Sequence, residues 1–359
     1  MPVYILAAAR TPMGAFGGRL RDVSPTELAA HALRETLHRG HVAPDQIAEV
    51  ILGSVHTGLQ GGNPALLAAR AAGIPADAPA YTVSVGSASG LKAVALAAQR
   101  LQQGRGTFVL GGGTESSSQA PYLLPGARWG VRFGEADLLD SLLLSNAALP
   151  QEAETIPAQC MIMDVDLEAW TEGSRKKVSD SRSHLAQEIV PLSVLRRKHL
   201  QVIHEDEPPE ASPIHPPQVG LAAPGDGAVA LLLSSTLPAE SQVPLAMVLD
   251  WVEMGSNSVG AVRGLLRQIG LTFPQIDCWE IHEASAAHLL AFLKETPEID
   301  PARVNLRGGA LALGDPLGAS GARLLASLAF TLQAEQLRTG IALIPAIGGP
   351  GIAMAISRS

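Results

Sequence analysis

The stretch AYTVSVGSASGLKAVALAAQRLQQGRGTFVLGGG, residues 80–113, decides the fold class. Its first part, 80–85, is rich in β-branched and apolar residues and predicts a strand, after which Gly86 turns the chain. A helix is predicted over 89–103, because apolar side chains recur there at helical spacing. The apolar run 107–110 predicts a second strand, which ends in a turn of three glycines. A buried strand that leads into a helix and then into another strand indicates an α/β sheet covered on both faces.

The same alternation extends outward from this stretch in both directions. On the N-terminal side, the predicted elements are strands over 4–8 and 49–55 and helices over 25–39 and 64–72. On the C-terminal side, they are strands over 225–233, 246–253, 278–282 and 341–344 and helices over 259–269, 284–294 and 322–333. The glycine-rich turn, helix and glycine-ended strand near the C-terminus repeat the order seen in residues 86–113. We therefore predict two related halves around a central pair of helices.

The middle of the chain breaks this pattern. A short helix is expected over 136–144 and an amphipathic stretch over 166–182, followed by an acidic, proline-rich run over 204–217. We interpret the whole segment as an inserted loop domain. The predicted domains are an N-terminal half over 1–119, the loop domain over 120–219 and a C-terminal half over 220–359.

The composition indicates a well-packed globular protein. Hydrophobic residues make up 47% of the 359 residues and charged residues 17%, which excludes disorder over most of the length. The formal net charge of −8 disfavours nucleic acid as a partner, because the overall field repels a polyanion. Two cysteines, Cys160 and Cys278, provide neither a disulfide framework nor a metal site, and no signal peptide or membrane span is predicted. We expect a cytoplasmic protein without a bound metal.

Ser87 is the first candidate for chemistry, since it stands between a glycine turn and a predicted helix. Backbone N–H groups and the positive end of that helix could stabilise an oxyanion beside a nucleophile. Serine is also a favoured helix N-cap, so a purely structural role stays open. Two common motifs are excluded. The glycine turn at 111–113 lacks the Gly-Lys-Ser/Thr of a P-loop. A zinc-protease helix requires two histidines four residues apart, whereas His282 and His288 lie six residues apart.

Short segments along nearly the whole chain resemble the thiolases, which comprise acetyl-CoA acetyltransferases and 3-ketoacyl-CoA thiolases. The segments are AAARTPMGAFGG at 7–18, EVILGSV at 49–55, GGNPA at 61–65, SGLKAVALA at 89–97, GGTESSSQAPY at 112–122, EIVPL at 188–192, GDGAVALLL at 225–233, EIHEASAAH at 280–288, GGALALGDPLGASGAR at 308–323 and GGPGIAMAI at 348–356. The resemblance implies an α/β thiolase fold with a duplicated five-layer αβαβα core and a loop domain. It also implies a homodimer that often pairs into a tetramer through a loop that corresponds to residues 128–133, and a tunnel for the pantetheine arm of coenzyme A.

The chain departs from the thiolase pattern at the residues that perform the chemistry of the family. The family's nucleophilic cysteine corresponds to Ser87, the histidine of its Gly-His-Pro motif to Asp315, and its second catalytic cysteine to Pro345. A serine hydroxyl is far less ionised than a thiol near neutral pH, an ionised aspartate opposes a nearby oxyanion, and proline carries no titratable group. We therefore do not expect Claisen condensation or thiolytic cleavage through these positions, because both need proton transfer at the substrate α-carbon.

A rebuilt catalytic triad is one hypothesis for this site. The family's Asn-Glu-Ala-Phe or His-Glu-Ala-Phe motif appears as His282-Glu283-Ala284-Ser285, so Ser87, His282 and Asp315 could act as nucleophile, base and orienting carboxylate. The predicted enzyme is an acyltransferase that forms an acyl-Ser87 intermediate from an acyl-CoA or acyl-pantetheine thioester. Two alternatives stay open: an inactive thiolase-like subunit that binds or stabilises a partner enzyme, and an acetyl-CoA acetyltransferase with weak residual activity.

Coenzyme A or acyl-CoA is expected as substrate rather than as a prosthetic group, with a carrier-protein thioester as the alternative donor. The resemblance places the basic run 175–177 in the part of the loop domain where the nucleotide phosphates dock in the family, although a solvated helix face explains the same run. The family serine that contacts pantetheine corresponds to Ala223. The predicted coenzyme A contacts are Arg175, Lys176, Arg182, Ala223, Gly348 and Gly349.

Overall fold

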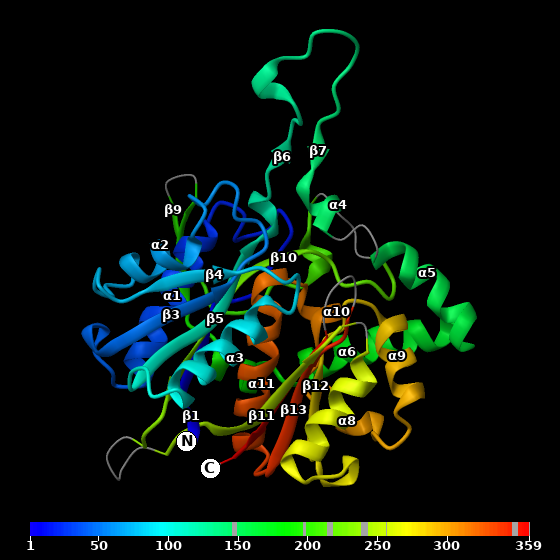
Figure 1. The fold of residues 1–359 in the computed structure, drawn as a ribbon. Helices are drawn as coiled ribbons and strands as arrows, with labels where there is room; N and C mark the ends of the chain where they lie inside the picture. The colour runs from blue at the N-terminus through cyan, green and yellow to red at the C-terminus, as the bar shows by residue number, and fades with distance from the viewer. Residues whose placement is uncertain are drawn as a thin grey trace.

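The computed structural model describes residues 1–145, 149–196, 199–213, 218–237, 243–255, 257–346 and 351–358 (Figure 1). Within these residues, ten strands form one large sheet with neighbours in the order β12-β13-β14-β11-β1-β10-β5-β3-β4, and β2 pairs with β10. The strands are β1 (Val3–Arg10), β2 (Gly14–Ala15), β3 (Ile47–Gly53), β4 (Ala80–Val83), β5 (Phe108–Ser116), β10 (Gly225–Ser234), β11 (Ala246–Met254), β12 (Cys278–Ile281), β13 (Thr339–Ile344) and β14 (Gly351–Ser357).

The sheet is symmetric about the antiparallel pair β1 and β11. Outward from β1, the strands β10 and β5 are antiparallel neighbours and β3 runs parallel to β5. Outward from β11, the strands β14 and β13 are antiparallel neighbours and β12 runs parallel to β13. The predicted duplication is therefore confirmed. Strand β10 lies after residue 220 in the sequence yet pairs between β1 and β5, so its place in the sheet lies with the N-terminal half; local periodicity does not reveal such long-range pairing.

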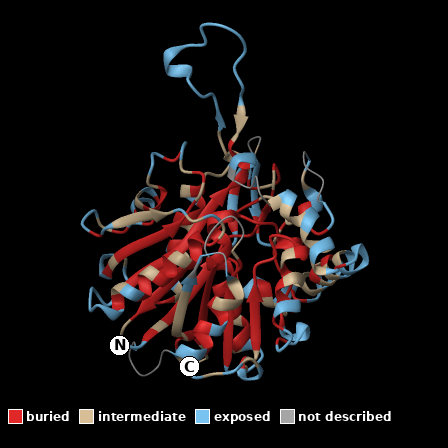
Figure 2. Cartoon of the chain, turned by 45° about the vertical axis from the view of Figure 1, so that its right-hand side comes forward, coloured by how far each residue is buried: buried red, intermediate tan, exposed pale blue. Residues whose placement is uncertain are grey.

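Helices form layers on and between the two halves of the sheet. The larger helices are α1 (Pro25–Arg39), α2 (Pro64–Ala71), α3 (Ser89–Gln102), α8 (Ser258–Ile269), α9 (Ala286–Glu295) and α11 (Ser320–Ala334). An apolar core joins α1 and α2 to the N-terminal strands, a second encloses α3 and α11, and a third joins α8 and α9 to the C-terminal strands. Figure 2 shows that most of the sheet and the central helices are buried, whereas the edge strand β4 is only partly buried. The five-layer arrangement predicted from the sequence is confirmed.

The two central helices approach each other closely because glycines face the contact. A Cβ atom on Gly90 of α3 would lie 2.8 Å from the backbone N of Ala322, and one on Gly321 of α11 would lie 2.6 Å from the backbone N of Leu91. Distances this short are not tolerated between real side chains and backbone, so only glycine permits this packing. The contact places the start of α3 beside the segment that leads into α11.

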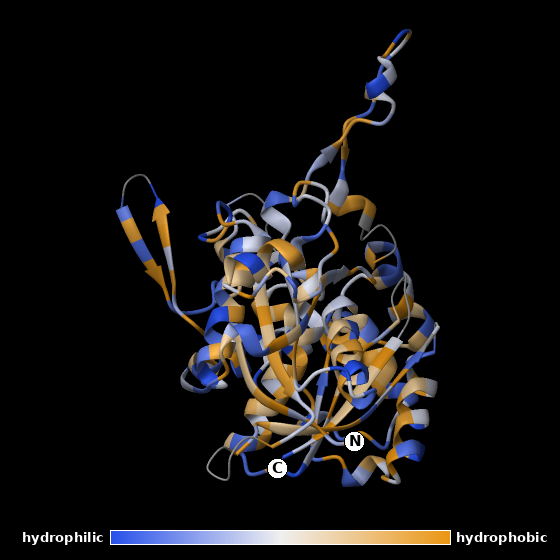
Figure 3. Ribbon diagram, turned by 60° about the vertical axis from the view of Figure 1, so that its left-hand side comes forward, coloured by the Kyte–Doolittle hydropathy of each residue, from blue (hydrophilic) through white to orange (hydrophobic). Residues whose placement is uncertain are grey.

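Short helices and two hairpins occupy the middle of the chain. They are β6 (Tyr122–Leu123), β7 (Leu139–Asp140), α4 (Ser141–Ser145), α5 (Leu149–Cys160), α6 (Asp164–Asp180), α7 (Arg182–Glu188), β8 (Leu192–Arg196) and β9 (His199–Ile203). The helix expected over 136–144 was placed too early, because residues 139–140 pair with β6 and the helix begins at Ser141. The arm that contains β6 and β7 extends far from the body, and Figure 3 shows apolar stretches in both hairpins. No helix among the described residues is long and apolar enough to cross a membrane.

Candidate active site

Ser87 follows β4 at a tight turn and precedes the first residue of α3. Gly86 adopts φ +58°, a conformation that favours glycine. The turn is fixed by the Ser89 hydroxyl, which donates to the carbonyl oxygen of Gly86 at 2.5 Å and accepts from the N–H of Val85 at 2.8 Å. The cap position of α3 is Ala88, without a side-chain cap hydrogen bond. Ser87 is therefore not the helix cap, and its half-buried hydroxyl is directed elsewhere.

Asp315 lies in the turn that leads into α11, and both its backbone N–H and its carbonyl oxygen form hydrogen bonds with the segment 223–225. Its N–H donates to the carbonyl oxygen of Ala223 at 2.8 Å, and its carbonyl oxygen accepts from the N–H of Gly225 at 3.2 Å. The Ser320 hydroxyl donates to Oδ1 of the carboxylate. The aspartate side chain is buried, so the strand extension 223–225 and the first turn of α11 fix its direction.

The structure brings Ser87, His282 and Asp315 together around one carboxylate oxygen. The Ser87 hydroxyl donates to Asp315 Oδ2 at 3.4 Å, and His282 Nε2 lies 3.3 Å from the same oxygen. His282 follows β12, and its backbone N–H donates to the carbonyl oxygen of Leu343 at 2.9 Å. The order differs from the expected triad: the carboxylate, and not the imidazole, contacts the serine. The cause is that Asp315 enters between the other two side chains from the turn before α11.

The electrostatics favour an ionised Asp315. Burial alone would raise the pKa of this carboxyl. Attraction to His282, the hydrogen bond from Ser320 and the charge of Arg323 outweigh burial, so the pKa of Asp315 lies below its ordinary value. The group beside Ser87 is therefore a carboxylate that can accept a proton from the hydroxyl, with the His282 imidazole beside the same oxygen.

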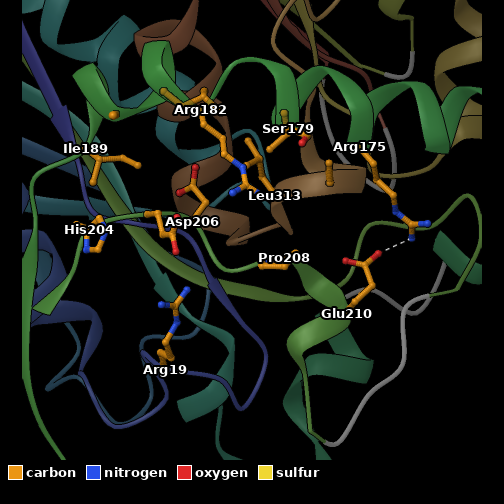
Figure 4. Close-up of a pocket in the computed structure, with 15 residues that line it drawn as sticks. Arg19, Arg175, Ser179, Arg182, Ile189, His204, Asp206, Pro208, Glu210 and Leu313 are labelled. Atoms are coloured by element: carbon orange, nitrogen blue, oxygen red, sulfur yellow. Dashed lines mark ion pairs between the residues drawn. The ribbon is translucent and has the colours of Figure 1, made fainter. Parts of the chain in front are cut away.

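The basic residues of the loop domain line a cavity of about 370 Å³ that is separate from this cluster. Figure 4 shows Arg182 and Arg19 pointing into the cavity from opposite sides, while Arg175 pairs with Glu210 at 2.7 Å. Lys176 is exposed and is not among the lining residues. Leu185, Ile189 and Leu313 give the cavity an apolar wall. Three guanidinium groups line the cavity together with three carboxylates, those of Glu205, Asp206 and Glu210, so its charged wall carries both signs. Arg182 is the guanidinium group of α7 that could bind an anion with an apolar part beside this wall.

The other predicted coenzyme A contacts divide into two cases. Ala223 is buried, and the structure shows its carbonyl oxygen holding the backbone of Asp315. Gly348 and Gly349 lie outside the described residues. Among the residues that are described, no group of three or more His, Cys, Asp or Glu side chains could hold a metal ion.

Sequence reasoning missed two polar arrangements near the site. Glu115, within the quoted GGTES segment, is buried and accepts hydrogen bonds from two separate loops. His288 accepts or donates at both ring nitrogens, with Nδ1 2.7 Å from the Ser285 hydroxyl and Nε2 3.1 Å from Glu152 Oε2. Burial lowers the pKa of His288, against an opposing effect of Glu152. The helical spacing of Ser285 and His288 was a signal for this pair, whereas Glu152 comes from a helix that was not predicted.

Comparison with known proteins decides the family. The family described as "Thiolase, N-terminal domain" matches residues 3–216, and the one described as "Thiolase, C-terminal domain" matches residues 242–358. The chain belongs to the thiolase family. It is 36% identical to the cytosolic acetyl-CoA acetyltransferase of Rattus norvegicus, over 99% of this chain and 98% of that protein. It is 35% identical to the acetyl-CoA acetyltransferase of Chromobacterium violaceum, over the full length of both.

Solved structures agree with this assignment to the thiolases. The crystal structure of the Bacillus anthracis acetyl-CoA acetyltransferase superposes with a TM-score of 0.93 at 30% identity, covering 100% of this chain and 99% of that one. Human mitochondrial 3-ketoacyl-CoA thiolase superposes with a TM-score of 0.92 at 29% identity, with the same coverage. The resemblance predicted from the sequence is thus confirmed. In this thiolase the buried residue directly after β13 is Pro345, which places no titratable side chain there.

Proposed function

We propose that this thiolase transfers an acyl group from an acyl-CoA or acyl-pantetheine thioester through an acyl-Ser87 intermediate, without carbon–carbon bond formation. The observation that carries the proposal is the hydrogen bond from the Ser87 hydroxyl to Asp315 Oδ2 at 3.4 Å. An alcohol needs a base in contact to become a nucleophile. Asp315 takes this part, and His282 Nε2 lies 3.3 Å from the same oxygen, where a protonated imidazole would form an ion pair with the carboxylate.

The reaction runs in two balanced steps. Ser87 Oγ attacks the thioester carbonyl while its proton passes to Asp315, the carbon–sulfur bond breaks, and the departing thiolate takes that proton. An alcohol, amine, thiol or water then attacks the serine ester while its proton passes to Asp315, the bond between the acyl carbon and Ser87 Oγ breaks, and Ser87 Oγ takes that proton. The N-terminal end of α3 supports negative charge on the carbonyl oxygen, because its first N–H groups have no partner within the helix.

The cavity beside α6 and α7 is the proposed binding place for the coenzyme A phosphates. Arg175 and Arg182 both line it, which supports two of the predicted contacts, whereas the exposed Lys176 contributes at most to the surrounding field. Gly348, Gly349 and Ala223 remain proposed contacts for the pantetheine arm. A homodimer and tetramer are proposed on the family likeness, and the exposed side chains of Trp129 and Phe133 in the β6–β7 arm support the tetramer. The name "cytosolic" of one relative supports a cytoplasmic location.

The names of the relatives favour a second candidate, an acetyl-CoA acetyltransferase. This function needs a proton acceptor at the α-carbon of the acetyl group. Pro345 does not supply one, so the acceptor would have to be His282 or Asp315. Condensation of two acetyl-CoA molecules that is lost in Ser87→Ala would support this candidate.

Intact-protein mass spectrometry tests the proposal directly. The protein is incubated with acetyl-CoA, longer acyl-CoA thioesters and the matching acyl-pantetheine thioesters. We expect a mass gain of one acyl group that disappears in Ser87→Ala and persists in Ser84→Ala, a matched change at an exposed serine of the same loop. No adduct with any donor, together with no thioester turnover, would refute the acyl-serine enzyme and leave an inactive subunit that binds a partner enzyme.

A further inference from the structure

Glu115 is a buried carboxyl to which the proposed reaction assigns no step. It lies near the end of β5 and is 0% exposed. Oε2 accepts from the N–H of Val55 at 2.8 Å and from the N–H of Gly318 at 3.1 Å. Oε1 accepts from the N–H of His56 at 3.1 Å and from the Ser54 hydroxyl at 3.4 Å. One side chain therefore joins the loop after β3 to the turn before α11.

The turn that Glu115 holds is strained. Leu317, two residues after Asp315, has φ +24°, in a region that residues with a Cβ rarely adopt. Such a conformation persists only where the surroundings hold it. The hydrogen bond from the next residue, Gly318, to Glu115 is one such restraint.

Glycine packing shows how tightly this turn is enclosed. The Gly318 carbonyl oxygen would lie 2.6 Å from a Cβ on Gly53, 2.8 Å from one on Gly90 and 2.1 Å from one on Gly113. A Cβ on Gly318 itself would lie 2.6 Å from Ser54 Cα. Strands β3 and β5 and helix α3, which Ser87 precedes, therefore all meet the turn that carries Asp315.

We propose that Glu115 is a positioning residue that clamps the turn 315–318 and so sets the contact between Asp315 and Ser87. The packing fixes where the turn lies, and the carboxylate fixes its orientation through the N–H of Gly318. Burial raises the pKa of Glu115 to about 7, while hydrogen bonds from Val55, His56 and Gly318 oppose that effect. The role in acylation rests on the proposed function, whereas the clamp itself does not.

The variant Glu115→Gln tests the clamp on the turn 315–318 and the positioning role in acylation separately. Glutamine keeps the shape, but its amide NH₂ replaces one carboxylate oxygen. In one amide orientation the N–H groups of Val55 and Gly318 lose their acceptor, and in the other the N–H of His56 does. Glu115→Asp keeps the charge on a shorter arm and gives a second variant if the first does not fold. Glu188→Gln is the matched control: Glu188 is also buried, and it accepts from Arg10 and Ser327 instead of from this turn.

Hydrogen–deuterium exchange measures the clamp without any assumption about activity. In Glu115→Gln we expect the peptide that spans 314–321 to exchange about tenfold faster, as loss of a buried hydrogen bond implies, with α1 unchanged. The control leaves 314–321 unchanged. Equal exchange at 314–321 in the wild type and both Glu115 variants overturns the clamp.

The rate of Ser87 acylation measures the positioning role. We expect Glu115→Gln to lower the maximal acylation rate about tenfold with little change in the donor concentration at half-saturation, since Glu115 does not line the cavity proposed for coenzyme A. Faster exchange with an unchanged acylation rate overturns the positioning role. If the wild type forms no adduct, the proposed function fails, and the exchange experiment alone still decides the clamp.

Discussion

Glu280→Gln is expected to change how the stability of this thiolase depends on pH. Glu280 lies in β12 and is 0% exposed, and neither carboxyl oxygen has a hydrogen-bond partner among the described residues. Burial raises its pKa from 4.5 to about 8, Arg323 opposes this effect, and Glu188 reinforces it. A neutral, protonated carboxyl is therefore the form that the folded protein accommodates at neutral pH.

The sign and size of the effect follow from proton linkage. Between about pH 5 and 8 the folded state holds a proton on Glu280 that the unfolded state has lost, so raising the pH favours unfolding. One such proton lowers the free energy of unfolding by about 1.4 kcal/mol for each pH unit. From about pH 5.5 to 7.5 the wild type therefore loses about 2–3 kcal/mol through this group. Glutamine does not titrate, so Glu280→Gln loses nothing through this position.

Urea unfolding at about pH 5.5, 6.5 and 7.5 measures the difference. The stability of Glu280→Gln relative to the wild type should rise by about 2–3 kcal/mol across this range, whatever its absolute value at one pH. Glu172→Gln, at an exposed carboxyl of α6, serves as control. Parallel stability curves for Glu280→Gln and the wild type would refute the reasoning, since they would mean that Glu280 is ionised in the folded protein.

Three further changes test the helix packing, the catalytic base and the cavity. Gly321→Ala should lower the free energy of unfolding by about 2 kcal/mol in chemical denaturation, because its Cβ meets the α3 backbone, while Gly173→Ala, in a helix position with no atoms within 4 Å, should raise it by about 0.5–1 kcal/mol. If both substitutions change the free energy of unfolding by the same amount, the inferred close packing of α3 and α11 is wrong. Asp315→Asn should lower the rate of Ser87 acylation in the mass-spectrometric assay about 100-fold, and an unchanged rate would remove Asp315 as base. Arg182→Ala should raise the dissociation constant of coenzyme A in calorimetry about fivefold, less so at high salt, with Lys176→Ala unchanged; equal effects would place the phosphates outside the cavity.

Local signals made several elements predictable from the sequence. Helix α1 has the expected bounds, because Ser24 and Glu27 form a capping box at its start and Gly40 follows its end. Helix α3 ends one residue earlier than expected, and it starts directly after the Gly86 turn. Capping residues and glycine turns act on the few residues next to them, so these signals can be recognised from the sequence alone.

Other elements depend on contacts that are distant in the sequence. Helix α5 was not predicted, and its Pro157 and polar residues hide any helical periodicity. Strand β10 was predicted as a strand, but its place between β1 and β5 depends on partners more than 100 residues away. The hairpin β8–β9 was missed, since three of its side chains, Leu195, Leu200 and Val202, are apolar yet exposed.

The candidate site shows the same division. The family likeness brought Ser87, His282 and Asp315 into one hypothesis, and the structure places all three around Asp315 Oδ2. The sequence did not predict that Asp315, and not His282, contacts Ser87, because this order depends on which side chain enters between the other two. The role of the buried Glu115 was not predicted either, since a glutamate that accepts hydrogen bonds from backbone N–H groups produces no spacing pattern in the sequence.

Because Asp315, and not His282, contacts Ser87, detection of the acyl adduct should be a more sensitive assay than measurement of steady-state turnover. A carboxylate whose pKa lies below its ordinary value is a weak base, so proton transfer from Ser87 to Asp315 makes both acylation and deacylation slow. Transfer of an acyl group from a thioester to a serine hydroxyl runs downhill, because an oxygen ester is less reactive than a thioester. The acyl-serine formed slowly at this site should therefore persist. We expect accumulation of the adduct on Ser87 to be measurable under conditions in which steady-state turnover is too slow to follow.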